Sequence, residues 1–492
     1  MGGALAQLSS VGVADAFLTA SPQITYFKSI WRRHTNFSLE AIDQVFDGTA
    51  DFGRKATVQL SRNGDLVSRV WLQVTLPDLA AYDITPAPAE GNSVDVTAAA
   101  QVTTSTAAQD LQGTAATLVY KKSSTIFAYE KSGRRYTDAA LTSEIKTWPY
   151  MVASGNTYVV PTALVRWCNS VGHALVSSVE LEIGGQRIDR HFSEWWDIWS
   201  ELSEKEEKRA GLWSMVGKYD ATAYDTYARE HAGPRTLFIP LTFCFNRHAG
   251  LALPLVALAY HAVKFNFEFR PYLECINSTV PVTALTSKEG AMLPTLGDIR
   301  LYAEYVFLDT PERRRFATMP HEMLVEQLQF LGDEAVLPSA VNRKFQLNFN
   351  HPVKELVWVY VPKAHYDVDP ETGNRLFDYF IPGSPDVDVF DTAKIVLNGN
   401  DRISERPAGY FKRVQPYQHH TRCPAKNVYV YSFALTPEDV QPSGSCNFSR
   451  IDSAQLQLKL RDDIELGRVK IYALSYNVVR IQSGMAGLSF SN

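Results

Sequence analysis

The chain has 492 residues, of which 45% are hydrophobic and 21% charged, so it can bury a sizeable core and is not disordered as a whole. The formal net charge of −5 gives no overall attraction to nucleic acid or acidic lipid, so any such contact must be local. The five cysteines form no CxxC pair, which favours reduced thiols over a disulfide framework. No apolar run approaches the ~20 residues that cross a bilayer, and the first ten residues do not resemble a signal peptide. We therefore expect a protein that is made and kept in a cytoplasm.

Residues 1–36 are predicted to form an N-terminal arm that contains a short helix. Ser21 followed by proline is typical of a helix N-cap and first helical position. The basic cluster Arg32, Arg33 and His34 follows, where cations suit the helix dipole. Helix-end complementation and surface salt bridges explain this cluster most simply, and a position facing a membrane or a genome is the alternative hypothesis.

From Phe37 onward the sequence favours strands, and the clearest pair lies in Phe238–Arg270. In its second run Val263, Phe265, Phe267 and Phe269 alternate with polar residues, which is typical of a strand with one buried face. The segment Val428–Leu460 repeats the same plan, with two alternating runs separated by a connection. A pattern that occurs twice indicates an internal duplication.

Other short segments also match in pairs, and their common order along the chain supports two related units. The pairs are Arg54-Lys55 with Arg343-Lys344, Val70-Trp71-Leu72 with Val357-Trp358-Val359, Ile183-Gly184-Gly185 with Leu397-Asn398-Gly399, and Leu301-Tyr302-Ala303 with Ile471-Tyr472-Ala473. The glycine-containing pair is predicted to form hairpin turns.

The first unit is longer than the second because of extra residues at three places. Residues 81–160 are rich in Ala, Thr and Ser, as a long solvent-facing excursion would be, and define an insertion at about 77–175. A second excursion spans 192–235, and a third lies around 272–297.

The second excursion is predicted to contain one amphipathic helix, with Ser193 as its cap and Gly211 at its end. Trp195, Trp196 and Trp199 share one face of this helix. Packing against a sheet is the simpler role for them, and an interface role is the alternative if one face stays exposed.

The predicted fold is all-β, with two tandem eight-stranded jelly rolls, long inserted loops and a few short helices. Each unit offers about eight short strands with turns at the spacing of a sandwich or barrel. A two-sheet jelly roll meets that number and leaves few open sheet edges. The predicted divisions are an arm with a short helix at 1–36, a first jelly roll at 37–310, a linker helix at 311–320 and a second jelly roll at 321–492.

No catalytic, cofactor-binding or metal-binding residues are predicted. The 11 histidines form no HxH, HExxH or Cys/His zinc spacing. The adjacent His419 and His420 are interpreted as a polar surface pair, because neighbours in a strand point to opposite faces. Asp367, Asp369 and Glu371 alternate in a loop, where solvated carboxylates are favoured over a weak cation site.

Three long segments resemble the major capsid proteins of nucleocytoplasmic large DNA viruses. They are LTASPQITYFKSIWRRHTNFS near the N-terminus, FIPLTFCFNRHAGLALPLVALAYHAVKFNFEF in the middle and YVYSFALTPEDVQPSGSCNFSRIDSAQLQLKL near the end. The resemblance implies a double jelly roll that forms a homotrimer with a pseudo-sixfold outline. It also implies that long loops after the fourth and sixth strands of a roll crown the outer surface, and residues 77–175 and 192–235 occupy comparable gaps.

The function that this resemblance implies is structural and not enzymatic. Trimers would tile the icosahedral shell of a virion assembled in the host cytoplasm. The implied partners are neighbouring capsomers, minor capsid and penton proteins, and an internal membrane near the N-terminal arm, with no cofactor and no sequence-specific nucleic acid. The alternative is a minor capsid or spike-type jelly-roll protein that binds glycans. A jelly-roll enzyme is disfavoured because the metal-binding triad of that class is missing.

Overall fold

The computed structural model describes residues 3–18, 27–29, 31–79, 165–219, 233–278, 285–287, 294–338, 342–366, 374–381, 384, 387–462 and 464–490, and seven short strands between 84 and 159. Those strands are β4 (Ile84–Pro86), β5 (Ala99–Ala100), β6 (Thr117–Lys122), β7 (Thr125–Lys131), β8 (Arg134–Tyr136), β9 (Val152–Ser154) and β10 (Thr157–Val159). They pair in the order β5-β6-β7-β8 and β9-β10, while β4 pairs with β17 (Leu285–Ser287).

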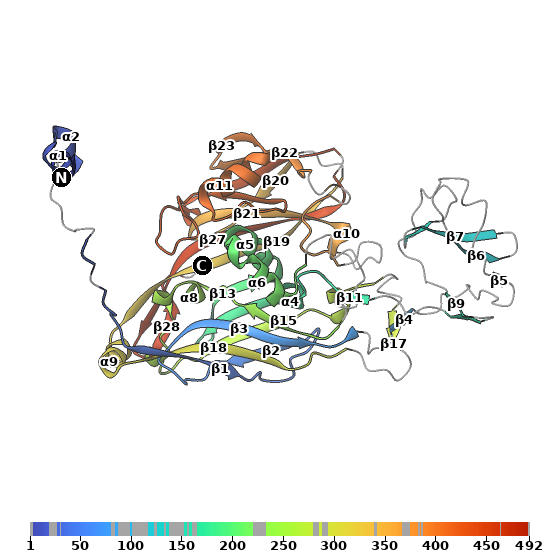
Figure 1. Cartoon of the computed structure of the whole chain (residues 1–492), viewed down its shortest axis with the longest axis horizontal. Coiled ribbons are helices and arrows are strands. Elements are labelled where there is room, and N and C mark those ends of the chain that lie inside the picture. The colour runs from blue at the N-terminus through green and yellow to red at the C-terminus, as the bar shows by residue number, and fades with distance from the viewer. Residues whose placement is uncertain are drawn as a thin grey trace.

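The first half of the chain forms a sandwich of two four-stranded antiparallel sheets (Figure 1). Sheet 1A has the order β1 (Phe37–Gln44), β18 (Ile299–Leu308), β3 (Leu66–Leu76), β14 (Arg235–Pro240). Sheet 1B has the order β13 (Gln186–Phe192), β12 (Val176–Ile183), β15 (Val263–Phe269), β2 (Lys55–Gln59). A short pair, β11 (Val165–Trp167) with β16 (Ile276–Ser278), lies beside them.

The second half repeats this arrangement. Sheet 2A has the order β19 (His321–Val336), β27 (Gly467–Gln482), β21 (Pro352–Pro362), β24 (Val428–Ser432), extended by β25 (Cys446–Asn447) and β28 (Met485–Leu488). Sheet 2B has the order β23 (Asn400–Pro407), β22 (Phe390–Leu397), β26 (Ala454–Leu460), β20 (Asn342–Gln346). In both sandwiches the A sheet orders the first, eighth, third and sixth strands, and the B sheet the fifth, fourth, seventh and second. The predicted double jelly roll and its internal duplication are therefore confirmed.

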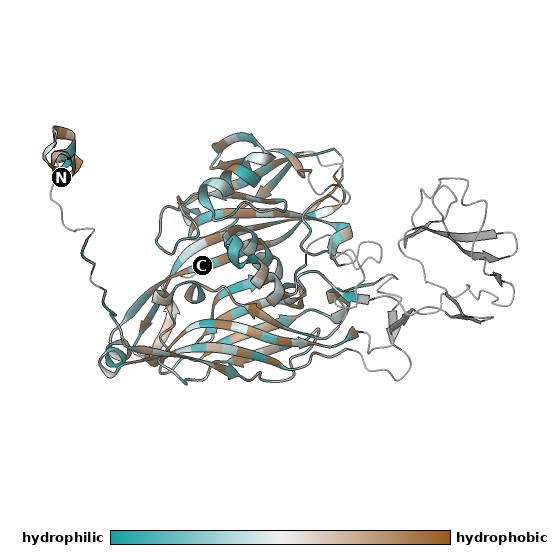
Figure 2. Cartoon of the chain, viewed as in Figure 1, coloured by the Kyte–Doolittle hydropathy of each residue, from teal (hydrophilic) through white to brown (hydrophobic). Residues whose placement is uncertain are grey.

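Alternation along the strands explains why these segments pair as they do. In β15 every second side chain is buried, beginning with Val263, and β26 repeats this pattern with Leu456, Leu458 and Leu460. Figure 2 shows hydrophobic and hydrophilic residues interspersed along the strands of the body. Burying each of these side chains contributes about 1.5–3 kcal/mol relative to leaving it exposed. A register slip of one residue would move all of them to solvent, so the burial pattern also fixes the pairing.

The two predicted hairpin turns also form. In the first, Gly184 and Gly185 have positive φ angles of 60° and 86°, and in the second Asn398 and Gly399 have 47° and 81°. Gly and Asn adopt left-handed backbone more readily than other residues do. A Cβ atom at Gly184 would come within 2.2 Å of the His261 ring, so the first turn has no room for a side chain.

Short helices connect the strands. The α-helices are α1 (Gly3–Ser9), α2 (Val13–Leu18), α4 (Val171–Leu175), α5 (Ser193–Ser203), α6 (Glu206–Val216), α8 (Cys244–Arg247), α9 (Thr310–Thr318), α10 (Lys363–Tyr366) and α11 (Gln415–His419). A π-helical turn, η8 (Tyr410–Val414), precedes α11, and the 3-10 turns are η4 (Ala249–Leu251), η5 (Leu255–Ala257), η6 (Tyr272–Cys275) and η9 (Phe448–Arg450). The helix α9 joins the sandwiches, and the Asp309 carboxylate accepts a hydrogen bond from the N–H of Thr310 at its start.

The helix predicted in the second excursion differs from the observed one in three respects. Helix α5 begins at Ser193 itself after an extended Phe192, so Ser193 is not the cap. The chain is extended at 204–205, which divides the predicted helix into α5 and α6. Gly211 stays helical within α6, and Gly217, with φ of 70°, ends the helix instead, as a left-handed glycine commonly does.

The N-terminal arm also differs from its prediction. Ser21 and the start of the predicted helix lie outside the described residues, and residues 27–29 and 31–36 are not helical. Helices α1 and α2 lie earlier, extend away from the body and bury no side chain (Figure 1). Counted from β1, the insertions 77–175 and 192–235 follow the third and fifth strands of the sandwich, one strand earlier than the resemblance implied.

One apolar cluster spans the contact between the sandwiches, and a separate cluster fills the core of the second sandwich. One cluster of buried residues contains the inner side chains of the first sandwich together with Val325, Val357, Tyr472 and Val479 of the second. Val357 and Tyr472 pair with each other and come from the face of sheet 2A that points away from its own partner sheet. The second sandwich therefore buries both faces of sheet 2A, one in its own core and one against the first sandwich.

Candidate functional site

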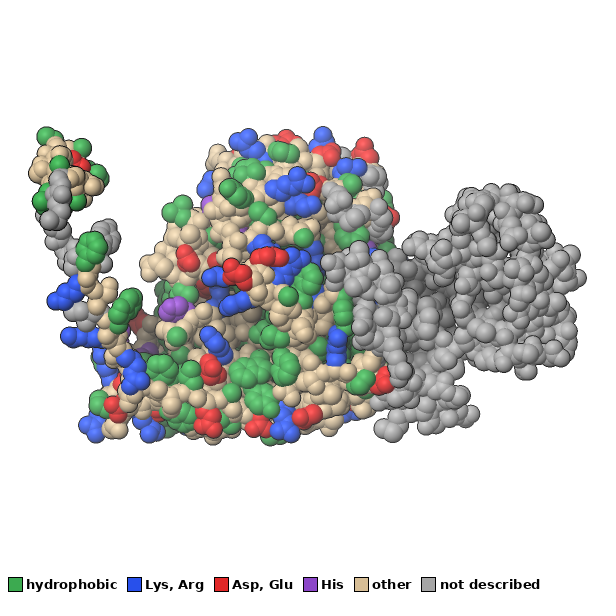
Figure 3. Space-filling view, in the orientation of Figure 1, with side chains coloured by type: hydrophobic (Ala, Val, Ile, Leu, Met, Phe, Trp, Pro, Cys, Tyr) green, Lys and Arg blue, Asp and Glu red, His purple; other side chains and the backbone are tan. Residues whose placement is uncertain are grey.

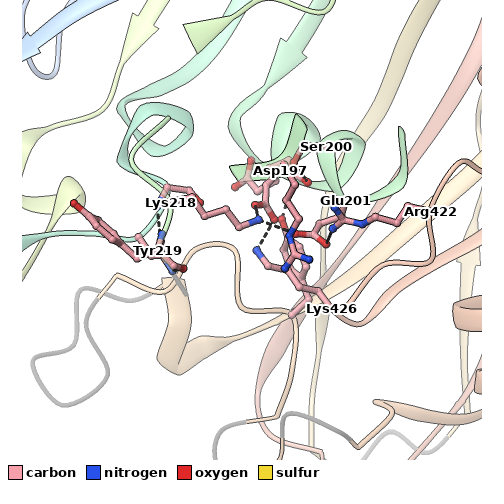
Figure 4. Close-up of polar contacts among 12 residues, drawn as sticks. Asp197, Ser200, Glu201, Lys218, Tyr219, Arg422 and Lys426 are labelled. Carbon is pink, nitrogen blue, oxygen red and sulfur yellow. Dashed lines mark hydrogen bonds and ion pairs between the residues drawn. The ribbon is translucent and has the colours of Figure 1, made fainter. Parts of the chain in front are cut away.

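Helix α5 carries a row of buried acidic residues along the seam, which we define as the contact between α5 and the second sandwich. Asp197 and Glu201 lie one turn apart, so their carboxylates share a face of the helix. The ammonium group of Lys218 lies 3.2 Å from Asp197 Oδ1 and 2.7 Å from Glu201 Oε1. From the second sandwich, Lys426 Nζ lies 2.7 Å from Asp197 Oδ2, and Arg422 pairs with Glu201 (Figure 4).

A second part of the seam surrounds Glu194, one turn earlier on α5. Lys470 of β27 approaches Glu194 Oε1 to 2.9 Å, and Arg270, which follows β15, approaches it to 3.4 Å. Arg270 also donates to the Ser193 hydroxyl at 2.8 Å, and that hydroxyl donates to Glu194. The carboxylate of one helix is thus held by cations from both sandwiches.

The seam is ionised although it is buried. Burial alone would raise the pKa of Glu194, but Lys470 and Arg270 outweigh it and lower the pKa to about 2. Burial likewise opposes ionisation of Asp197, and Lys218 and Lys426 hold the pKa of that carboxyl well below its usual range. Removing one partner from such a cluster leaves an uncompensated buried charge, which typically costs about 3–5 kcal/mol. The seam therefore holds the two sandwiches in one relative position.

A second buried charge cluster lies under β19. Glu326 pairs with Arg247 of α8 and with Lys354 of β21, so residues from both sandwiches meet again. Arg247 also donates to the carbonyl oxygen of Glu438 at 2.8 Å.

His420 extends this cluster and corrects its predicted role as part of a surface pair. It follows α11 and not a strand, its side chain is fully buried, and it lies 3.0 Å from Glu355 and 2.8 Å from Glu438. Burial opposes the charged imidazolium, but Glu355 and Glu438 outweigh it and raise the pKa of His420 to about 9. His420 is therefore a buried cation near neutral pH.

The three predicted tryptophans of the helix lie inside the molecule. Trp195, Trp196 and Trp199 are 2%, 3% and 6% exposed. The Trp195 ring lies 5.5 Å from the ring of Tyr472 in β27, and Arg247 lies over Trp199 at 4.5 Å. Trp195 thus contacts the second sandwich, Trp199 contacts a residue of the first, and all three rings are buried within the chain, which is the packing role described above. The acidic residues between them were missed, although carboxylates among tryptophans on one helix face were the available signal.

The predicted basic cluster lies apart from the seam. Arg32, Arg33 and His34 are exposed, and Arg33 donates to the Asn36 side chain at 2.8 Å. Phe27 and Trp31 beside them are 97% and 90% exposed. This segment presents large apolar and basic side chains together and buries neither.

Among the described residues, no three His, Cys, Asp or Glu side chains are grouped to hold a metal ion. Asp367, Asp369 and Glu371, considered above as a weak cation site, lie outside the described residues. No helix in the described part of the chain is long and apolar enough to span a membrane. Two duplicated eight-stranded sandwiches locked by buried ion pairs define the double jelly-roll class of structural subunit.

Comparisons with known proteins give the family. Residues 312–487 match the model of the large eukaryotic DNA virus major capsid protein, and residues 25–105 and 98–309 match that of the major capsid protein N-terminus. The chain is 37% identical to the major capsid protein of Pyramimonas orientalis virus and 35% identical to that of Phaeocystis pouchetii virus, each over 100% of both chains. The chain belongs to this family of major capsid proteins, and it is a structural protein.

Solved structures support the same fold. PBCV-1 VP54, from a crystal structure fitted into a cryo-EM reconstruction of the virophage Sputnik, matches with a TM-score of 0.67 and 29% identity, over 95% of this chain and 100% of that chain. The Faustovirus major capsid protein also has a TM-score of 0.67, at 14% identity over 96% of this chain and 94% of that chain, and supports the fold alone.

Proposed function

We propose that this capsid protein forms a homotrimer that serves as a pseudo-hexagonal capsomer and tiles an icosahedral shell. The observation that supports this is the identical strand order of the two sandwiches. Three chains with two similar sandwiches each present six similar units around a threefold axis, and such a ring fits a hexagonal lattice. The units of this proposal are residues 37–310 and 321–492, joined through 311–320.

The seam supports the proposal because a capsomer needs its six units at fixed positions. Asp197, Glu201 and Glu194 bind cations of the second sandwich, so the two units of one chain move as one body. Obligate assemblies of such bodies bury large interfaces, typically about 2,000 Å² or more. Contacts between neighbouring capsomers, minor capsid proteins and penton proteins complete the shell in this proposal.

The mass of the purified chain in solution tests the trimer. We expect light scattering after size exclusion to give three times the chain mass of 55.0 kDa at micromolar concentration. Electron microscopy of the same material at high concentration should show hexagonal arrays. A persistent monomer would contradict the proposal.

We further propose that the N-terminal arm faces the interior of the particle, against an internal membrane, in virions assembled in the host cytoplasm. The exposed Phe27 and Trp31 next to Arg32 and Arg33 support this, because apolar rings with adjacent cations are typical of contact with anionic lipid surfaces.

Vesicle binding tests the arm. We expect the chain to sediment with vesicles that contain anionic lipid, with binding that falls as salt rises. The double variant Arg32→Ala, Arg33→Ala should bind about 30-fold more weakly, because each cation near the surface contributes roughly 1 kcal/mol. Replacing Arg343 and Lys344, which lie on β20, is the matched control. Equal binding by both double variants would contradict an interior membrane contact through this cluster.

A further inference from the structure

Within one chain, the edge strand β13 of the first sandwich packs against the edge strand β19 of the second. The backbone N–H of Leu328 donates to Asp189 Oδ1 at 2.9 Å, and the Gln327 side chain donates to the carbonyl oxygen of Ile188. The Phe192 and Phe330 rings meet at 5.0 Å. This contact joins an A-sheet edge to a B-sheet edge.

The duplication provides a second copy of each of these edges, and both copies are largely exposed. In strand order β1 corresponds to β19 and β23 corresponds to β13. Seven of the eight residues of β23 are exposed, and six of the eight residues of β1 are exposed. Phe37 and Leu39 on β1 are 50% and 52% exposed, whereas Leu328 on β19 is 7% exposed. The covered edges thus have uncovered counterparts.

We propose that β23 of one copy of this chain packs against β1 of a second copy, repeating between chains the contact that β13 makes with β19 within each chain. The proposal deepens the proposed trimer and rests on it. Figure 1 places β1 and β23 on opposite sides of the body, so one chain does not join its own two edges. The contact is head-to-tail, and three copies close it into a ring if each turn is one third of a circle.

The register of the covered edge identifies which residues meet. Tyr302 of β18 and Tyr472 of β27 are matched positions whose side chains point to the same side of their A sheets. Tyr302 pairs with a residue of β1, and Tyr472 pairs with a residue of β19. Glu40 and Gln327 precede those two partners by the same number of residues, so Glu40 on β1 corresponds to Gln327 on β19. The Gln327 side chain donates to the carbonyl oxygen of Ile188. Ile188 has no partner residue in β12, because the β12–β13 register shifts at this point.

In the second sandwich the register of β22 with β23 shifts in the same way and leaves Arg402 without a partner residue in β22. Arg402 therefore occupies the position that Ile188 occupies in the first sandwich. Glu40 of one copy is therefore expected beside Arg402 of the next. Arg402 lies 5.7 Å from the Tyr431 ring and 5.9 Å from the Phe433 ring, and among the described residues neither Arg402 nor Glu40 has an ion-pair partner. Their charges are complementary. Figure 3 shows hydrophobic side chains over the lower part of the body, where Figure 1 places β1, β3 and β18.

Cross-linking tests which edges meet. The double variant Glu40→Cys, Arg402→Cys is prepared in a Cys423→Ser background, because Cys423 is exposed. A short bismaleimide should give covalent dimers and trimers of the double variant, while each single variant stays uncross-linked. Cross-linking of Glu40→Cys alone would show β1 against β1 and overturn the proposal.

Charge reversal supplies a second measurement that does not depend on a new thiol. Glu40→Arg and Arg402→Glu should each raise the concentration at which the trimer dissociates by about tenfold or more, since like charges then face each other. The combined variant should recover most of this loss. Lys459→Glu, an exposed reversal on β26, should leave dissociation unchanged.

The two proposals fail separately. A monomeric wild-type chain would contradict the trimer itself. A wild-type trimer that shows no cross-link in the double variant and no recovery in the combined reversal would leave the trimer intact and overturn the assignment of β1 and β23.

Discussion

The two sandwiches share a strand order but differ in what covers the outer faces of their A sheets. In the second sandwich Val357 and Tyr472 point outward and are buried against the first sandwich. In the first sandwich the matched outer face carries Trp71 and Tyr302, whose rings stack at 5.6 Å while remaining half-buried, and Phe238 is 38% exposed. Duplication thus gave one scaffold twice. One copy of the face joins the two units of a chain, and the other stays partly exposed on the single chain.

Truncation at matched core positions tests whether the sandwiches unfold together. Phe265→Ala in β15 and Leu456→Ala in β26 remove side chains that are fully buried, at a cost of about 3–5 and 2–5 kcal/mol. We expect both variants to shift one common denaturation transition, because the apolar cluster that contains Phe265 also includes Val357 and Tyr472 of the sheet that covers the core around Leu456. The exposed Lys459→Ala should change stability by less than about 0.5 kcal/mol. Two separate transitions, each moved by only one variant, would contradict a common unit.

Removing one charge from the seam should lower the stability of the protein more than removing one charge from a surface ion pair. Asp197→Asn removes the charge that Lys218 and Lys426 face in the interior, and we expect a loss of about 3–5 kcal/mol in guanidinium denaturation. Glu268→Gln breaks the exposed pair with Lys55, at 3.2 Å, and should cost less than about 1 kcal/mol. Equal losses in the two variants would mean that the seam does not hold the sandwiches together.

The buried charges make stability depend on pH in opposite directions at the two ends of the range. The pKa of Glu194 is lowered from 4.5 to about 2, so its contribution is present above pH 4.5 and is lost as pH falls towards 2. The pKa of His420 is raised from 6.5 to about 9, so its contribution is present below pH 6.5 and is lost as pH rises through 9.

Denaturation midpoints measured across pH separate the two groups. His420→Gln should lower stability at pH 6 and flatten its decline between pH 6.5 and 9, while the acid side stays as in the wild type. If the stability of this variant fell between pH 6.5 and 9 as steeply as that of the wild type, a group other than His420 would be responsible for the loss of stability at alkaline pH.

The smallest expected effects on stability come from substitutions in the two hairpin turns. Gly184→Asn introduces the residue that the second sandwich has at Asn398, but its Cβ would meet His261, so we expect a loss of about 1–3 kcal/mol. Asn398→Gly should cost less than about 1 kcal/mol, because either residue adopts a positive φ. Similar effects of both changes would show that the first turn moves aside for a side chain.

Alternation was sufficient to predict the strands that have one wet face. Val263 to Phe269 could be read directly, and the repeat near Leu456 confirmed it. The central strand β21 is buried on both faces, so its alternation is lost. The sequence match that aligned Trp71 with Trp358 was therefore wrong, because the two side chains point to opposite faces of their sheets. Trp71 points to the outer face, and Trp358, 1% exposed, points into the second core.

The seam could not be predicted because its partners are distant in sequence. Nothing local to Asp197 indicates Lys426, and nothing near His420 indicates Glu355. The division of the predicted helix at 204–205 also left no sequence signal, since charged residues fit a helix surface as well as a turn. Periodicity reports which face of an element is buried, and it does not report what covers that face.

The arrangement of sandwiches in the assembled protein tests the account most directly. A cryo-EM reconstruction of the purified oligomer should show six sandwiches around a threefold axis, with first and second sandwiches alternating and β1 of each chain beside β23 of the next. A dimer, an open chain of subunits, or a trimer in which like sandwiches meet would contradict it.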